Sequence, residues 1–178
     1  MYSSEAYKID LKGLKDGVSS LEYHLDDSYF AALAEENEGL EVSRGCVDVA
    51  LNINKVAETF DVTLRVAGKV VIPCNVCLDD MEQPIEASYK LVVKLGEEDS
   101  DEGDIITVAA DEAIWDISWL IYEYVDLAIP VRHVHAPGKC NPVMMKMLGE
   151  HSATRSGGED TAEADIDPRW NALKNLKI

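Results

Sequence analysis

The sequence contains no apolar run that could cross a membrane, because every hydrophobic stretch is interrupted well before ~18 residues. Its first residues, Met1 to Lys8, also lack the basic and then apolar pattern of a secretory signal. Both absences lead us to expect a cytoplasmic protein. In a reducing cytoplasm, cysteines serve as metal ligands, redox groups or small core residues more often than as disulfides.

Positive charge is also scarce. The 178 residues include 16 Lys and Arg but 34 Asp and Glu, which gives a net charge of −18 and an isoelectric point of about 4.4. A broad basic face that grips phosphates is not expected, because phosphate neutralisation supplies most of the non-specific affinity for nucleic acid. The acidity suits a basic partner instead, and it favours solubility.

Motifs of catalysis are missing as well. The sequence has no glycine-rich nucleotide-binding motif, no Ser, His and Asp in a supporting context, and no carboxylate pair that stands out from the general acidity. His24 and Cys46 fall on polar faces of predicted strands, and neither is expected to be catalytic. We therefore expect that the protein is not an enzyme.

The sequence does contain strong period-two alternation in its middle. Apolar and polar residues alternate over 47–53, 60–66 and 85–95, which is typical of antiparallel strands with one buried face. From Asp111 the spacing becomes helical and continues until Pro130. We expect an α+β fold, with a mainly antiparallel β-sheet or partly closed barrel packed by one principal amphipathic helix.

Composition divides the chain into three parts. Residues 1–149 are expected to form a single α+β domain that ends in a short helix beginning at Asn141-Pro142. Residues 150–168 are rich in Ser, Gly, Thr, Ala and acidic side chains, and they predict a flexible acidic linker. Residues 169–178 predict a short amphipathic motif that becomes ordered only when docked, so a disordered C-terminal tail is expected.

The C-terminal motif is the candidate partner-binding element. Tryptophan and arginine are typical of interfaces, and Trp170, Leu173 and Leu176 fall on one side of a helix. We favour docking on an external partner, and folding back onto the acidic body is the alternative. The residues assigned to partner binding are Arg169, Trp170, Leu173, Lys174 and Lys177.

Two short segments contain most of the soft metal ligands. Cys74 and Cys77 form a Cys-x-x-Cys knuckle at the tip of a predicted hairpin, and His133, His135 and Cys140 follow the main helix. Tetrahedral sets of thiolates and imidazoles are typical of structural zinc, so the sequence predicts a structural zinc site and no other cofactor. A redox pair is an alternative, although a strand rather than a helix follows the knuckle. A knuckle that packs without metal is another.

Three features of the sequence resemble the YceD family, which is associated with accumulation of large-subunit ribosomal RNA. The first is the knuckle segment Ile72–Leu78. The second is an acidic loop followed by a hydrophobic helix that ends in Leu127–Val131. The third, and the most specific, is the terminal run Asp167–Lys177, because both its order and its position at the very end resemble the family.

This resemblance implies a ligand set and a role. Many members carry a cysteine near the position of His135, and a histidine there keeps a ligand. The implied zinc ligands are therefore Cys74, Cys77, His135 and Cys140, with His133 in reserve. The implied role is that of a non-enzymatic factor in bacterial ribosome biogenesis, whose partner is a basic ribosomal protein or the pre-ribosomal large subunit.

Two other functions remain open from the sequence. One is a thiol-redox or metal-dependent enzyme that uses the knuckle of Cys74 and Cys77. The other is direct binding of ribosomal RNA. Neither a membrane nor a small-molecule substrate is expected. The cations available for RNA, besides those of the C-terminal motif, are Lys69, Lys90, Lys94, Arg132 and Lys139.

Overall fold

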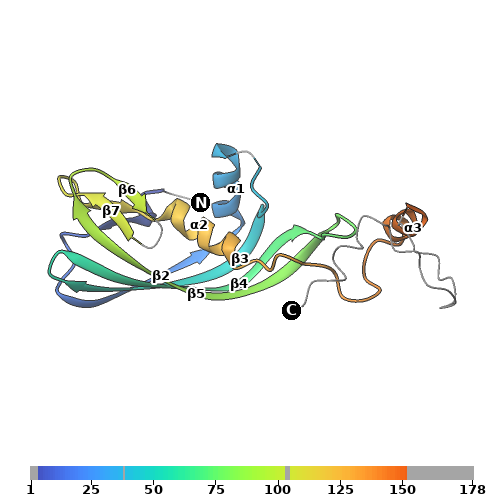
Figure 1. The fold of residues 1–178 in the computed structure, drawn as a ribbon, viewed down its shortest axis with the longest axis horizontal. Helices are drawn as coiled ribbons and strands as arrows, with labels where there is room; N and C mark the ends of the chain where they lie inside the picture. Colours follow the sequence, from blue (N-terminus) through green and yellow to red (C-terminus); the bar gives the residue numbers. More distant parts are fainter. Residues whose placement is uncertain (1–3, 38, 103–104, 152–178) are drawn as a thin grey trace, which may run out of the picture.

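The fold is given by a computed structural model, which describes residues 4–37, 39–102 and 105–151. Residues 152–178 lie outside the described residues, and with them the predicted C-terminal motif and most of the predicted linker. The described chain forms a strongly curved sheet with helices α1 and α2 on its concave side and helix α3 beyond one end (Figure 1).

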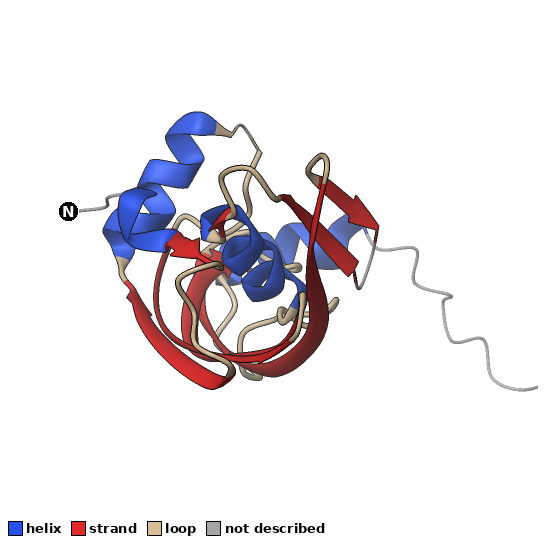
Figure 2. Cartoon of the chain, turned by 90° about the vertical axis from the view of Figure 1, so that its left-hand side faces the viewer, coloured by secondary structure: helices blue, strands red, loops and turns tan. Residues whose placement is uncertain are grey.

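The sheet is mainly antiparallel, as expected. Its six strands lie in the order β2-β3-β4-β5-β7-β6, and β1 and β8 pair in a separate two-stranded sheet. The sheet curls around α2 without closing into a barrel (Figure 2). The strands are β1 (Lys8–Asp10), β2 (Gly17–Leu25), β3 (Arg44–Val56), β4 (Thr59–Pro73), β5 (Asp80–Gly96), β6 (Ser100–Glu102), β7 (Ile105–Ala109) and β8 (Ile114–Asp116).

The alternating residues of the central strands form the buried face of the sheet. Leu51 on β3 lies opposite Leu64 on β4, and Phe60 on β4 lies opposite Val93 on β5. All four side chains are at most 1% exposed. Because successive residues point to opposite faces of a strand, the polar residues between them face solvent.

The core is closed by two helices of ten residues each, α1 (Asp27–Glu36) and α2 (Ser118–Leu127). Helix α1 begins where the Asp26 carboxylate accepts hydrogen bonds from the backbone N–H groups of Ser28 and Tyr29, at 2.9 and 3.3 Å. Helix α2 lies in the hollow of the sheet (Figures 1 and 2). Its inner side buries Ile121, Tyr122 and Val125.

The start of the principal helix differs from the prediction. Ile114 was expected to lie in the helix, but residues 114–116 form β8, which pairs with β1. The Asp116 carboxylate then accepts hydrogen bonds from the N–H and hydroxyl groups of Ser118, at 2.9 and 2.6 Å, at the first residue of α2. The apolar residues at 114, 115 and 117 fit both the period of a strand and the period of a helix. Residues 114–116 form a strand because they pair with β1, about a hundred residues earlier in the chain.

The acidic segment after β5 also differs from the loop that its charge indicates. Part of it forms the edge strand β6, and β7 follows and inserts between β6 and β5. Since β6 is antiparallel to β7, the chain returns in the direction of β5, and the β5–β7 pair is parallel. The mainly antiparallel sheet therefore contains one parallel pair among the described strands.

Strands β4 and β5 extend past the helices as a long hairpin whose tip carries the cysteine knuckle (Figure 1). The segment after α2 runs along this hairpin to its tip and continues into α3 (Pro142–His151). No residue of α3 is buried, and Val143 and Met147 are 66% and 50% exposed. None of the helices in the described part of the chain has the length and apolar content needed to span a bilayer.

Candidate metal centre at the hairpin tip

The tip of the β4–β5 hairpin is a compact turn built around Cys74. The N–H of Cys74 donates to the carbonyl of Asp79 at 2.9 Å, and the N–H of Leu78 donates to the carbonyl of Cys74 at 3.0 Å. Leu78 has a positive φ of 63°, which a leucine adopts at some cost in energy. The N–H of Val76 points at Cys74 Sγ, 3.4 Å away. The turn thereby places both thiols on the same side.

The second half of the site comes from the segment between α2 and α3. Lys139 N–H donates to the carbonyl of Ala136 at 2.9 Å, and Pro137 and Gly138 occupy the two central positions of this turn. Gly138 has a φ of 78°, which fits the third position of a type II turn. The turn reverses the chain, so that His135 before it and Cys140 after it face the same point.

The structure brings together the four residues that the sequence selects as zinc ligands, Cys74, Cys77, His135 and Cys140. One ligand atom of each lies within 4.8 Å of all the others. Cys74 Sγ is 3.9 Å from Cys140 Sγ, and Cys77 Sγ is 3.4 Å from His135 Nδ1. Sulfur and nitrogen ligands about 2.0–2.3 Å from one zinc ion stand roughly 3.3–3.8 Å apart at tetrahedral angles. The donor set and its spacing are therefore compatible with zinc.

Two thiols of the cluster are buried, and the pKa values of Cys74 and Cys140 are shifted in opposite directions. Cys74 and Cys77 are 0% and 1% exposed. Burial alone would raise the pKa of Cys74, but N–H donors of Cys77, Val76 and His135 together lower that pKa from 9.0 to about 5. Burial and hydrogen bonds to Cys74 and Cys77 raise the pKa of Cys140 to about 11. Since zinc binds thiolates, loading the site would release protons, that of Cys140 among them.

His133, the ligand held in reserve, does not belong to this cluster. Its side chain is buried, with Nδ1 2.9 Å from the carbonyl of Pro130 and Nε2 3.3 Å from a Glu41 carboxylate oxygen. Residues 133–135 form no strand, and the chain bends at 131–132 before them and at 136 after them. His135 alone therefore reaches the thiols.

Two asparagines, which the sequence did not assign to the site, fasten its halves together. Asn75 Oδ1 accepts the N–H of His133 at 2.7 Å, and Asn75 N–H donates to the carbonyl of His133 at 3.0 Å. Asn141 Nδ2 donates to the Asp79 carboxylate at 3.1 Å, while Asn141 Oδ1 accepts the N–H of Val143 at the start of α3. The position of Asn75 between the two cysteines was the signal available in the sequence.

The remaining predicted residues lie apart from the metal cluster. Cys46 is exposed on the outer face of the sheet, 3.8 Å from His24, whose ring is 2.7 Å from Asp48. Lys69 is paired with Glu82 at 3.2 Å. The other candidate RNA-binding cations are exposed, namely Lys90, Lys94, Arg132 and Lys139. The predicted partner-binding residues lie outside the described residues, namely Arg169, Trp170, Leu173, Lys174 and Lys177.

A curled sheet that holds a helix, together with a Cys and His cluster from two segments, defines an α+β protein with a candidate metal clasp. A family model described as "Large ribosomal RNA subunit accumulation protein YceD" matches residues 62–177. The match begins in β4 and takes in both halves of the cluster and all five residues of the predicted partner-binding motif. The chain belongs to the YceD family. Searches among curated proteins and among solved structures gave no match.

Proposed function

We propose that this protein is a non-enzymatic ribosome biogenesis factor that supports the accumulation of large-subunit ribosomal RNA in the bacterial cytoplasm. The observation that carries the proposal is membership of the YceD family, whose description names this role. The matched region contains the hairpin tip, helix α2 and the C-terminal motif. These parts are then the ones through which the role is performed.

The charge of the chain supports binding to protein rather than to bare RNA. A chain with a net charge of −18 repels phosphates and attracts basic proteins. The partner in this proposal is a basic ribosomal protein, either free or on a pre-ribosomal large subunit. Direct RNA binding is the rival; it would need the exposed Lys90, Lys94 and Arg132, and it predicts an affinity that falls steeply with salt.

The three parts predicted from composition have separate tasks in this proposal. The domain of residues 1–149 supplies the acidic body, and the linker of residues 150–168 lets the end of the chain search for a partner. The motif of residues 169–178 docks as an amphipathic helix through the partner-binding residues. Arg169 and Trp170 are of the residue types that dominate interface energies.

The zinc ion of this proposal has a structural role. Cys74, Cys77, His135 and Cys140 would hold it, and it would tie the hairpin tip to the segment that leads from α2 to α3. Four protein ligands leave no open position on a tetrahedral ion, which is typical of a structural site and not of a catalytic one.

Depletion of the protein tests the proposed function. We expect the ratio of large-subunit to small-subunit ribosomal RNA to fall, with fewer mature large subunits in a sucrose gradient, and expression of the full chain to restore both. An unchanged ratio and an unchanged subunit profile after verified depletion would contradict the proposal.

A thiol-redox enzyme is the second candidate, and one observation favours it. Cys74 has its pKa lowered to about 5 and lies 3.9 Å from the thiol of Cys140. A thiolate next to a second thiol is the arrangement that disulfide exchange needs. Elemental analysis of the purified protein separates the two: stoichiometric zinc supports the structural site, and zinc-free protein that forms a Cys74–Cys140 disulfide supports redox chemistry.

A further inference from the structure

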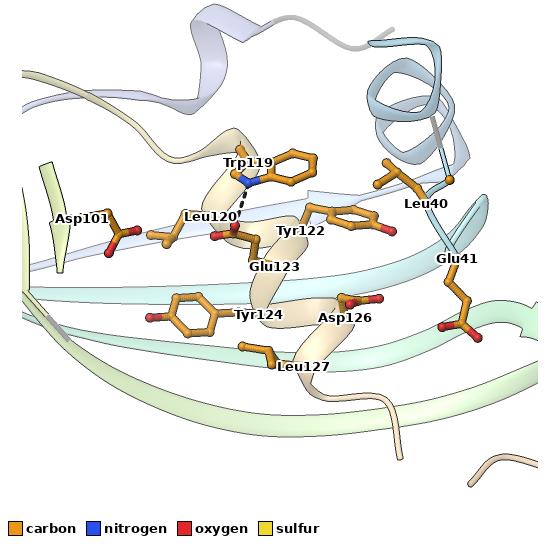
Figure 3. A pocket seen from close by; sticks show the side chains of 11 residues that line it. Leu40, Glu41, Asp101, Trp119, Leu120, Tyr122, Glu123, Tyr124, Asp126 and Leu127 are labelled. Atoms are coloured by element: carbon orange, nitrogen blue, oxygen red, sulfur yellow. Dashed lines mark hydrogen bonds between the residues drawn. The ribbon is translucent and has the colours of Figure 1, made fainter. Parts of the chain in front are cut away.

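A groove of about 620 Å³ lies on the side of α2 that faces away from the sheet (Figure 3). The exposed side of α2 forms its floor, the segment 39–41 after α1 borders it on one side, and Asp101 of β6 borders it on the other. The groove is separate from the metal cluster, since none of the four Cys and His residues lines it. Its volume suits a few side chains rather than a whole domain.

Carboxylates surround this groove. Glu41, Asp101, Glu123 and Asp126 line it, and the described lining residues include no Lys or Arg. Glu41 lies near His133 and Glu123 accepts a hydrogen bond from Trp119, whereas Asp126 has no side-chain partner among the described residues. Burial and then repulsion from Glu41 raise the pKa of Asp126 above its ordinary value. A cation placed here would relieve that repulsion.

The rest of the lining is apolar and aromatic. Trp119, 41% exposed, stacks on Tyr122 with ring centroids 5.5 Å apart and an interplanar angle of 21°. Its indole N–H donates to Glu123 at 2.7 Å, which fixes the ring beside a carboxylate (Figure 3). Leu127 is 68% exposed at the other end of the floor. A flat aromatic surface next to carboxylates is suited to a guanidinium group, which stacks and forms two hydrogen bonds at once.

We propose that the α2 groove binds an arginine-bearing apolar segment of a basic partner protein. An arginine of that segment stacks on Trp119 and pairs with Glu123 or Asp126, and an apolar neighbour covers Leu120 and Leu127. The assignment rests on the proposed function, because it names the surface of the acidic body through which a basic ribosomal protein is held. RNA is disfavoured here since four acidic residues and no Lys or Arg line the described groove, which would repel a phosphate.

The test uses the full chain and a short fluorescein-labelled peptide rich in arginine and leucine. A matched peptide with citrulline in place of arginine keeps the shape and removes the charge. The groove variant is Glu123→Gln with Asp126→Asn. The control variant is Asp61→Asn with Glu86→Gln, which makes the same charge change at two exposed positions on the outer face of the sheet. Circular dichroism and a thermal midpoint verify that both variants fold.

We expect the groove variant to weaken binding of the arginine peptide about ten-fold, as loss of charge-assisted hydrogen bonds implies, and the control variant to leave it within about two-fold. The citrulline peptide should bind about ten-fold more weakly to the unchanged chain. Equal losses in both variants would overturn the proposal, because binding would then follow net charge alone.

Other occupants give their own results, each of which overturns the proposal. If Arg169→Ala with Trp170→Ala tightens peptide binding about ten-fold in the full chain, the groove holds the protein's own C-terminal motif. If the groove variant converts a dimer to a monomer in sedimentation, the occupant is a second copy. If an oligoribonucleotide binds and the groove variant abolishes that binding, the occupant is RNA.

Failure of this assignment is distinguishable from failure of the proposed function. A groove variant that binds the peptide normally and fully restores large-subunit RNA in depleted cells removes the groove from the account and leaves the biogenesis role intact. Unchanged RNA on depletion removes the biogenesis role whatever the peptide does.

Discussion

At the scale of single residues, Asn75 joins the hairpin tip to the segment that follows α2. Its carbonyl oxygen accepts the N–H of His133 at 2.7 Å, and its amide nitrogen lies 3.1 Å from His133 Nε2. Because Pro130 O lies 2.9 Å from Nδ1, the ring donates there and can accept from Asn75 at Nε2. One asparagine thus satisfies both the backbone and the ring of a buried histidine.

Replacing Asn75 by alanine leaves the backbone N–H of His133 without its partner and leaves Nε2 with the Glu41 carboxylate as its only neighbour among the described contacts. We expect Asn75→Ala to lower the free energy of unfolding by about 1–3 kcal/mol, the usual cost of unsatisfied buried polar groups. Urea denaturation of the zinc-loaded protein gives the measurement, and Asn54→Ala on β3 is the matched control, because no side-chain partner is described for it. A loss below about 0.5 kcal/mol would show that water replaces Asn75.

The four cysteines differ in exposure, and their alkylation should follow that difference. Cys46 is exposed, whereas Cys74 and Cys77 are buried and Cys140 is half-buried. If the cluster holds zinc as proposed, we expect iodoacetamide to modify Cys46 alone in the native protein, and to modify the other three cysteines after a chelator is added. Peptide mass mapping detects each site, and Cys46→Ser controls for the first reaction. Rapid modification of Cys74 without chelator would contradict a closed structural site.

At the scale of elements, α2 connects the core to the groove. Its inner side is buried in the curved sheet, where Ile121 is 0% exposed, and its outer side carries Leu127 at 68% exposure. We expect Ile121→Ala to cost about 2–5 kcal/mol of unfolding free energy, through lost burial and a residual cavity. Leu127→Ala, on the outer side, should cost less than about 0.5 kcal/mol.

Equilibrium denaturation of the two variants gives both values. Equal costs would show that α2 is not anchored in the sheet as described. A higher free energy of unfolding for Leu127→Ala than for the unchanged chain would instead indicate that this leucine is retained for binding. Exposed apolar residues are commonly kept for function rather than for stability.

The elements that could be predicted are those specified by local patterns. Period-two alternation identifies β3, β4 and β5, because one face of each strand is more buried than the other. Strand β8 could not be predicted, since Ile114 fits either period and its partner strand is far away in the sequence. The parallel β5–β7 pair likewise depends on where β6 lies, which no local pattern states.

The candidate metal site also combines features that a local pattern predicts with features that depend on tertiary contacts. The spacing of Cys74 and Cys77 is local and places two thiols together in one turn. The choice between His133 and His135 depends on the contacts of His133 with Glu41 and Asn75, which are tertiary. The groove on α2 was not foreseen, because its carboxylates come from three separate elements.

At the scale of the whole molecule, three features are arranged along one long body. The acidic groove lies over α2, the cysteine cluster lies at the tip of the β4–β5 hairpin, and the exposed apolar helix α3 follows the cluster (Figure 1). In the proposed function, the metal clasp sets where α3 leaves the body. Binding and structural integrity then depend on different regions of the same chain.

That the protein acts by binding the large ribosomal subunit or its proteins is tested most directly by affinity purification from growing cells. The tagged full chain is compared with the same chain lacking residues 169–178, each with and without ribonuclease. We expect large-subunit proteins to co-purify with the full chain, to persist after ribonuclease treatment, and to fall sharply without the terminal residues. Recovery of the full chain with no large-subunit component would contradict the binding role.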